Sequence, residues 1–274
     1  MHRALRTTDH RPWPIPDRPW TWRQRWDDLL FAHWAMEPEA LSPHLPPGVE
    51  LQTRDGVAWL AVVPFVLSRL AIRGLPPVPG LNTFPELNLR TYVEVDGVPG
   101  VWFFSLDASN PLAVWAANTV FKLPYYRARV DVRREGEALD FRSVRRRGGV
   151  GCDVRYRPSG PTALAPLDSL EAWLTERYCV YAGSRDGGLT RTEVHHEPWP
   201  LQPAEAEFRS LNLGEPFGIE LHRPPDLLHY SRGVDVVLWP GRRVGRGRSS
   251  AQAPGTPSVG VGTSAQPRVE RHSS

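Results

Sequence analysis

The sequence predicts an α+β fold in which a mostly antiparallel, curved sheet or barrel-like sandwich dominates and a few helices accompany it. Three observations support this fold class. Short apolar or alternating segments recur along the chain, Asp-Gly and Pro/Gly turns separate them, and only three segments have helical features. With 274 residues and 41% hydrophobic composition, the chain is long enough to bury a substantial core.

The strands are expected where apolar residues run continuously or alternate between turn signals. The pairs Asp55-Gly56 and Asp96-Gly97 predict tight turns between antiparallel strands, and Gly74–Gly80 predicts a loop. The expected strands are Leu29–Met36, Val49–Thr53, Val57–Val66, Leu87–Val95, Val101–Asp107, Ala128–Arg134, Ala138–Arg145, Val150–Arg157, Thr190–His196, Phe217–Leu221 and Val234–Trp239.

Three helices are expected. A short helix over Pro38–His44 ends before a Pro-Pro-Gly segment. Asn110 offers a capping side chain with proline behind it, which predicts a helix that runs to about Phe121. Asp168 with Glu171 three residues later predicts the start of the last helix, because this spacing forms a capping box.

The pattern places one domain over residues 18–240, between a flexible N-terminal segment (1–17) and a disordered tail (241–274). The tail is rich in Arg, Gly, Ser and Pro and has almost no large apolar residues, so it cannot offset the entropy cost of ordering. Its six arginines and one glutamate give it a charge of +5, so the net charge of +3 leaves about −2 for the rest. Binding to nucleic acid is therefore not expected.

No apolar run approaches the roughly 20 residues that a membrane-spanning helix needs. The N-terminus has no apolar centre of a secretory signal, so a cytoplasmic location is expected. Phosphate-loop, dinucleotide-binding, nucleophile-elbow and His-Glu-Xaa-Xaa-His patterns are missing from the sequence, and we expect no cofactor.

A metal site was weighed at Glu193, His195 and Glu197, which alternate on one face of an expected strand. Same-face neighbours on a strand rarely converge on one ion without ligands from elsewhere. An exposed polar edge is the favoured interpretation, and no metal site is predicted.

The most informative segment for function is Glu86–Glu94, where strand alternation puts polar side chains on one face and Leu, Thr and Val on the other. The polar set is Glu86, Asn88, Arg90, Tyr92 and Glu94. A sheet with one wetted side explains this pattern without any function. Alternatively, the face lines a cavity in which Arg90 offers its planar guanidinium to a carboxylate and Glu86 balances the charge.

Several ordered motifs resemble the uncharacterised YqjF-like family, domain of unknown function 2071. The main ones are Asn88–Val93, Trp102–Asp107 and Leu123–Tyr126, within a match from about Trp26 to Trp239. That family is similar in fold to acetoacetate decarboxylase, which implies a cone-like barrel around a pocket for a small acid.

The resemblance also implies where the chemistry would differ. In acetoacetate decarboxylase a turn with two adjacent lysines supplies a Schiff-base nucleophile. The similar turn here carries Tyr125 and Tyr126 instead, so the nucleophile is missing. Lys122, the single lysine of the chain, lies three residues before Tyr125, where its geometry would differ from that of the family lysine. The pocket glutamate of the decarboxylases corresponds to Glu86, with Asn88 as the alternative match.

The predicted function is a small-molecule pocket that binds an organic acid or keto compound through Arg90. Further ligand-binding candidates are Asn88, Tyr92 and Asp107, the last at a junction between a strand and a helix. The rival interpretation is a non-catalytic binding or structural domain whose polar strand face contacts solvent or a second subunit of a homo-oligomer.

If the protein is an enzyme, the catalytic candidates are Tyr125, Tyr126 and Glu86. Either tyrosine would act as a hydrogen-bond donor or general acid, and Glu86 would act as the base, without a covalent imine.

Overall fold

The computed structural model describes residues 2–80, 82–111, 114, 122–183 and 187–244. Most of the helix predicted over Asn110–Phe121 lies outside these residues, as does the tail from residue 245 onward. Within the described part, no helix is long and apolar enough to cross a membrane.

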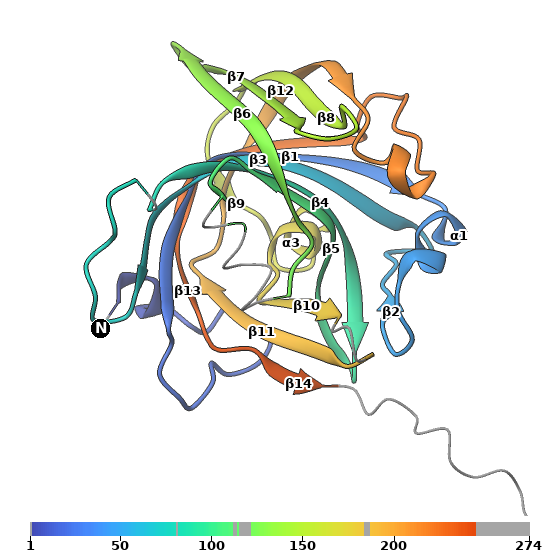
Figure 1. The fold of residues 1–274 in the computed structure, drawn as a ribbon. Helices are drawn as coiled ribbons and strands as arrows, with labels where there is room; N and C mark the ends of the chain where they lie inside the picture. The colour runs from blue at the N-terminus through green and yellow to red at the C-terminus, as the bar shows by residue number, and fades with distance from the viewer. Residues whose placement is uncertain (1, 81, 112–113, 115–121, 184–186, 245–274) are drawn as a thin grey trace, which may run out of the picture.

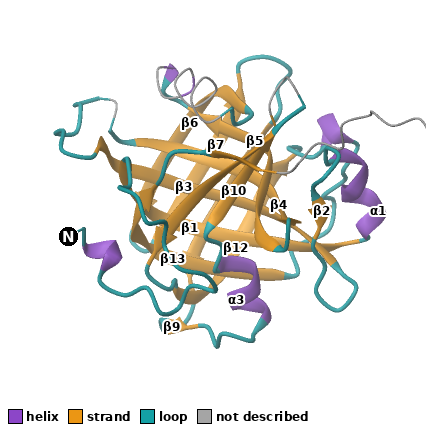
Figure 2. Ribbon diagram, turned by 90° about the horizontal axis from the view of Figure 1, so that it is seen from below, coloured by secondary structure: helices purple, strands orange, loops and turns teal. Residues whose placement is uncertain are grey.

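Fourteen strands among the described residues form one sheet, and only short helices accompany them (Figures 1 and 2). The strands are β1 (Trp22–Met36), β2 (Glu50–Leu51), β3 (Ala58–Ile72), β4 (Phe84–Val95), β5 (Val98–Ala108), β6 (Tyr125–Glu135), β7 (Ala138–Arg145), β8 (Gly151–Pro158), β9 (Ala163–Leu164), β10 (Cys179–Gly183), β11 (Leu189–His196), β12 (Pro200–Leu211), β13 (Leu227–Leu238) and β14 (Arg242–Val244). The helices are α1 (Pro38–Leu41) and α3 (Leu170–Thr175), with 3-10 turns at Arg3–Leu5, Ser42–His44 and Glu215–Phe217.

Seven strands close into a ring in the order β1, β3, β4, β5, β10, β11 and β13, because β11 pairs with β13 and β4 pairs with β5. All neighbours in this ring are antiparallel except β5 and β10. In Figure 1 the ring is viewed along its axis. The rotated view in Figure 2 shows that α3 lies across one end of the ring. The predicted fold class, a mostly antiparallel curved sheet with few helices, is confirmed.

A second layer, formed by β6, β7, β8 and β12, lies over one side of the ring (Figure 1). Leu87 and Leu89 of β4 pack there against Leu139, Phe141 and Val154 in a buried core. Because strand side chains alternate, the opposite face of β4 points into the ring. The apolar half of the β4 pattern is thus explained by the core between the two layers.

The tight turns agree with the predictions. Asp55 and Gly56 have φ of 54° and 81°, and Asp96 and Gly97 have φ of 52° and 75°. Two successive residues with positive φ are what a two-residue hairpin turn requires, and Asp-Gly meets this at little cost. The helix α3 begins one residue later than predicted, because Ser169 rather than Asp168 caps it by accepting from the Ala172 amide.

The strand predicted over Phe217–Leu221 is wrong. Pro216 lies within a 3-10 turn at Glu215–Phe217, and Gly218 ends it with φ of 67°. The strands β10 and β12 were not predicted from the sequence. The segment that forms β12 has two prolines and small alanines at its inward positions, so its apolar alternation is weak.

Both segments that flank the predicted domain contact the ring. Arg11 donates to the Val194 carbonyl at 2.6 Å and forms a buried ion pair of 2.8 Å with Glu193. Arg242–Val244, inside the segment predicted as tail, pairs with β11 as β14. The flexibility predicted for residues 1–17 stays a prediction, but the described part of this segment packs on β11.

Candidate functional site

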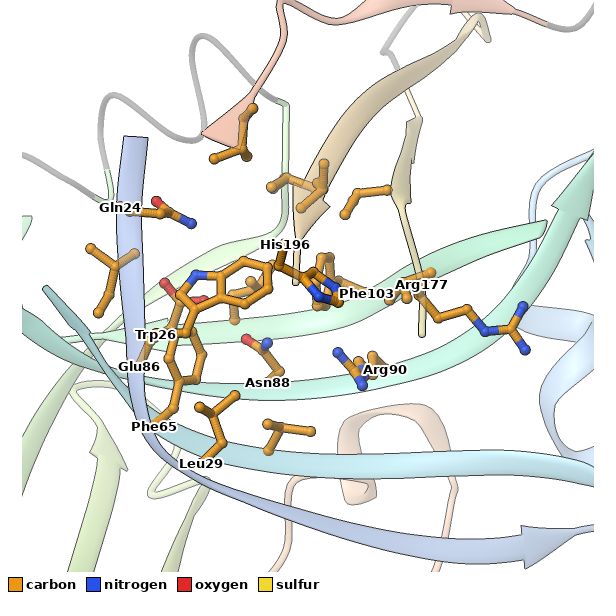
Figure 3. A pocket seen from close by; sticks show the side chains of 18 of the residues that line it. Gln24, Trp26, Leu29, Phe65, Glu86, Asn88, Arg90, Phe103, Arg177 and His196 are labelled. Carbon is orange, nitrogen blue, oxygen red and sulfur yellow. The ribbon is translucent and has the colours of Figure 1, made fainter. Parts of the chain in front are cut away.

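The ring encloses a cavity of about 170 Å³, and every one of its seven strands contributes to the wall (Figure 3). The lining is mainly apolar and aromatic. Its polar side chains are Gln24, Glu86, Asn88, Arg90, Tyr125, Thr175, Arg177, Cys179, Thr192 and His196. A mostly apolar cavity with a few convergent polar groups is typical of small-molecule sites.

Bulges decide which side chains face this cavity. In β1, Trp22, Gln24 and Trp26 line it, but after Asp28, which has φ of 56°, the face changes and Leu29 lines it. An extra residue in one strand reverses the alternation and bends the strand. The same change occurs in β3 around Arg69, whose φ is 55°. The bulges therefore help to curve the strands around the cavity.

The polar row of β4 lies as the alternation predicts. Glu86, Asn88 and Arg90 all line the cavity, and Figure 3 shows Asn88 between the other two. Glu86 is 3% exposed and Asn88 is 6% exposed. This face of β4 is therefore not exposed to solvent, as a sheet with one wetted side would require.

Glu86 is held as a neutral acid by its surroundings. The Tyr125 hydroxyl donates to Glu86 Oε2 at 2.8 Å. Burial raises the pKa of Glu86 to about 8, although the hydrogen bond from Tyr125 acts in the opposite direction. Burial, together with the neighbouring Glu86, also raises the pKa of Tyr125 well above its usual range. At pH 7 the pair is a carboxylic acid beside a phenol, so Glu86 can donate a proton and becomes a base only near pH 8 and above.

Arg90 lies in the wall, and it forms no ion pair with a carboxylate among the described residues. Its guanidinium carbon is 5.6 Å from the centre of the Phe31 ring and 5.8 Å from that of Tyr92. Its Nε and Nη2 atoms are buried and have no hydrogen-bond partner among the described residues. A partly buried cation with two buried, unsatisfied donor atoms is costly, and an anion in the cavity would remove that cost.

Arg177 is a second cation at the cavity and is itself buried. Its guanidinium carbon lies 4.9 Å from the Tyr92 ring centre and 4.3 Å from that of Trp173. Nη1 donates to Gln52 Oε1 at 2.7 Å, while Nε and Nη2 have no partner in the described part of the chain. Burial lowers the pKa of Arg177 to about 10, so it stays charged at pH 7.

Arg177 was not predicted as a site residue from the sequence. It follows the end of α3 and belongs to no alternating strand, so no periodicity marks it. The only signal was its place within the stretch from about Trp26 to Trp239 that resembles the family.

Tyr92 lies behind the two arginines rather than in the cavity wall. It is completely buried, and its hydroxyl is 2.7 Å from His33 Nε2. Its aromatic ring contacts Arg90 and Arg177 through cation–π interactions. Tyr92 therefore supports the cationic groups that line the cavity.

Asp107 and Tyr126 are not brought into the cavity. β5 and β6 are parallel neighbours here, with Leu106 opposite Tyr125 and Asp107 opposite Tyr126. Leu106 and Tyr125 line the cavity, so the next pair points to the other layer. There Asp107 accepts from Arg145 Nε at 2.8 Å, and the Tyr126 ring lies 4.0 Å from the Arg145 guanidinium carbon.

Asp107 is engaged in this ion pair with Arg145 and is not available to a ligand in the cavity. Burial raises the pKa of Asp107 to about 6, while the neighbouring Arg145 acts against that rise. Tyr126 is 41% exposed. The geometry thus separates two adjacent phenols, of which only Tyr125 reaches the cavity.

No lysine lines the cavity in the described residues. Lys122 is exposed, and the sequence contains no other lysine. The cavity therefore offers no side-chain amine with which a Schiff base of the decarboxylase type could form.

Two of the three residues considered as a metal site have other partners. Glu193 pairs with Arg11 and Arg191, and His195 Nε2 contacts the Ala4 carbonyl at 2.8 Å. In the described part of the chain, no group of three or more His, Cys, Asp or Glu is arranged to hold a metal ion.

Comparison with known proteins gives matches in both sequence and structure. The model of DUF2071, described as an uncharacterized conserved protein, matches residues 23–235. The uncharacterized protein YqjF of Bacillus subtilis (strain 168) is 44% identical over 230 residues, which cover 84% of this chain and 95% of that protein.

Two solved structures show the same fold at low sequence identity. The enduracididine biosynthesis enzyme MppR, complexed with pyruvate, has a TM-score of 0.59 at 14% identity and covers 89% of this chain and 97% of its own. Acetoacetate decarboxylase from Legionella pneumophila has a TM-score of 0.56 at 16% identity, with coverage of 86% and 94%.

Proposed function

The chain belongs to the DUF2071 family and has an acetoacetate-decarboxylase-like fold, and from this premise we propose that it binds a small organic acid or keto compound in the cavity of the ring. The observation that carries the proposal is Arg90, whose buried Nε and Nη2 donors have no partner among the described residues. A ligand carboxylate is planar and accepts two parallel hydrogen bonds, so it matches a guanidinium.

The surroundings of Arg90 support an anion rather than a neutral ligand. Arg177 adds a second buried positive charge, and neither arginine has a carboxylate within ion-pair distance in the described part of the chain. The aromatic rings of Phe31 and Tyr92 hold the Arg90 guanidinium without neutralising it. An incoming anion would therefore meet uncompensated charge in a site of low dielectric constant.

The printed name of one structural neighbour is consistent with an acid ligand, because MppR is described in complex with pyruvate. The likeness extends to the fold and not to the lysine chemistry, since this chain offers only the exposed Lys122. Any reaction in the cavity would proceed without an imine. Either the neutral Glu86, which accepts the Tyr125 hydrogen bond, or Tyr125 itself would serve as a hydrogen-bond or proton donor to a carbonyl group of the ligand.

The experiment is titration of the full-length protein with pyruvate and other small carboxylic acids by calorimetry. We expect Arg90→Ala to reduce binding at least tenfold while the melting temperature stays equal or rises, because the variant removes a buried unpaired charge. Arg73→Ala is the matched control, since Arg73 lies over the Trp20 ring outside the cavity.

The rival function is a non-catalytic structural domain without a small-molecule ligand. It predicts that Arg90→Ala lowers the melting temperature and that no carboxylic acid binds to either protein. That pair of results would refute the proposed function.

A further inference from the structure

We propose that the cavity selects monocarboxylates with an apolar body about the size of an aromatic ring, such as arylacetates, over smaller acids and over dicarboxylates. This inference deepens the proposed function and rests on it. It follows from where the polar groups of the wall lie and from what separates them.

The cationic groups and the neutral polar groups occupy opposite sides of the cavity. Figure 3 shows Arg90 and Arg177 on one side and Glu86 with Gln24 on the other. Arg90 and Glu86 are four residues apart on β4, which corresponds to about 13 Å along a strand. A ligand carboxylate at Arg90 would therefore leave most of the cavity to the rest of the ligand.

The space between these sides is walled by aromatic rings. The Trp26 indole stacks on Trp199 with ring centroids 5.9 Å apart and an interplanar angle of 7°, and Phe65 meets Trp26 edge-on at 6.1 Å. Phe103 of β5 also lines the cavity. Flat apolar groups gain both burial and ring contacts against such walls.

The size of the cavity fits this body. An apolar cavity of about 150 Å³ accommodates benzene, and the volume here is about 170 Å³. A ligand as small as pyruvate would leave aromatic wall facing empty space or poorly bonded water. Each additional buried methylene or ring carbon should therefore strengthen binding until the cavity is full.

The far side of the cavity is unsuited to a second negative charge. Glu86 and Tyr125 are hydrogen-bonded to each other there, and the residues labelled nearest to Glu86 in Figure 3, Gln24 and Trp26, carry no positive charge. A second carboxylate would lose its hydration there with no arginine to pair with it, which makes its burial costly. One carboxylate and one apolar body is therefore the favoured combination.

The test is calorimetric titration of the full-length protein with four probes: phenylacetate, pyruvate, 1,4-phenylenediacetate and phenylacetamide. We expect phenylacetate to bind at least tenfold more tightly than pyruvate and at least tenfold more tightly than the dicarboxylate. Phenylacetamide should bind at least tenfold more weakly than phenylacetate, because it lacks the charge for Arg90.

A substitution in the cavity wall tests the effect of cavity shape on binding separately from the effect of charge. Phe103→Trp should weaken phenylacetate at least tenfold and change pyruvate by less than threefold, with the melting temperature as the check on folding. If the larger ring unfolds the protein, Phe103→Leu should instead raise the affinity for 1-naphthylacetate relative to phenylacetate.

The outcomes distinguish the two proposals. Pyruvate or the dicarboxylate binding as tightly as phenylacetate would overturn the inference about ligand class and leave the organic-acid site intact. No binding by any carboxylate, or equal binding by phenylacetamide and phenylacetate, would overturn the proposed function and this inference with it.

Discussion

The Tyr125 hydroxyl and the Glu86 carboxyl meet at 2.8 Å inside the cavity, and this hydrogen bond joins β6 to β4. The next tyrosine, Tyr126, faces the other layer and lies over Arg145. Two adjacent phenols thus have different environments, which makes them a matched pair for experiment.

Replacing Tyr125 with phenylalanine should destabilise the protein by about 1 kcal/mol, because a buried carboxyl oxygen loses its hydrogen bond. Tyr126→Phe should change the free energy of unfolding by less than about 0.5 kcal/mol, since its ring contact with Arg145 survives. Urea denaturation at pH 7 measures both. Equal effects of the two variants would contradict the placement of Tyr125 in the cavity wall.

Glu86 should make the protein less stable as pH rises from about 4.5 to about 8. Its pKa is raised by burial from 4.5 to about 8, so in this interval the native state keeps a proton that the unfolded state has lost. The loss is at most about 1.4 kcal/mol per pH unit. Glu86→Gln should remove it, so the variant should gain in stability over the parent protein at each step from pH 5 to pH 8. If the stabilities of the parent protein and of Glu86→Gln changed in parallel with pH, burial would not raise the pKa of Glu86.

Borohydride reduction in the presence of pyruvate should produce no covalent adduct on a side chain. Lys122 is the single lysine and is exposed outside the cavity wall. Intact mass measurement before and after reduction tests this, and Lys122→Ala is the control for any surface modification. A mass increase that disappears in Lys122→Ala would mean that an imine does form.

Tyr92 should support the two arginines mainly through its ring. Tyr92→Phe keeps the ring but leaves His33 Nε2 without its partner, so we expect a loss of about 1–3 kcal/mol in stability. Binding of phenylacetate should change by less than threefold. Tyr92→Leu also removes the contacts with Arg90 and Arg177, and it should weaken binding more than Tyr92→Phe does.

Calorimetry and denaturation of the same two variants decide this role. If Tyr92→Phe abolished binding at unchanged stability, the hydroxyl would have to contact the ligand directly.

Much of the fold followed from local patterns. The Asp-Gly turns and the strand over Ala138–Arg145 agree with the structure, because a regular strand between tight turns obeys simple alternation. Predicted strands ended early where bulges interrupt that alternation. The strand predicted from Leu29 begins at Trp22, on the other side of the bulge at Asp28, and the one predicted to end at Val66 continues past Arg69 to Ile72.

Within the candidate site, the residues that the sequence placed together correctly are those on β4. The spacing of Glu86, Asn88 and Arg90 was enough to place them on one face. Asp107 was misplaced because an extra residue in β5, between Phe103 and Ser105, reverses the alternation, so that Leu106 lines the cavity and Asp107 points away from it. Arg177 was missed because its position depends on how the chain leaves α3, and no spacing rule encodes that.

The closed hydrogen bonding of the seven-stranded ring limits how this cavity can change. Every ring strand is paired on both sides, so widening the enclosure by spreading strands would break rows of backbone hydrogen bonds at once. Differences in ligand preference among homologous proteins should therefore arise from single substitutions of inward-facing side chains. An engineer could accordingly retune the selectivity of this scaffold one wall residue at a time without redesigning its backbone.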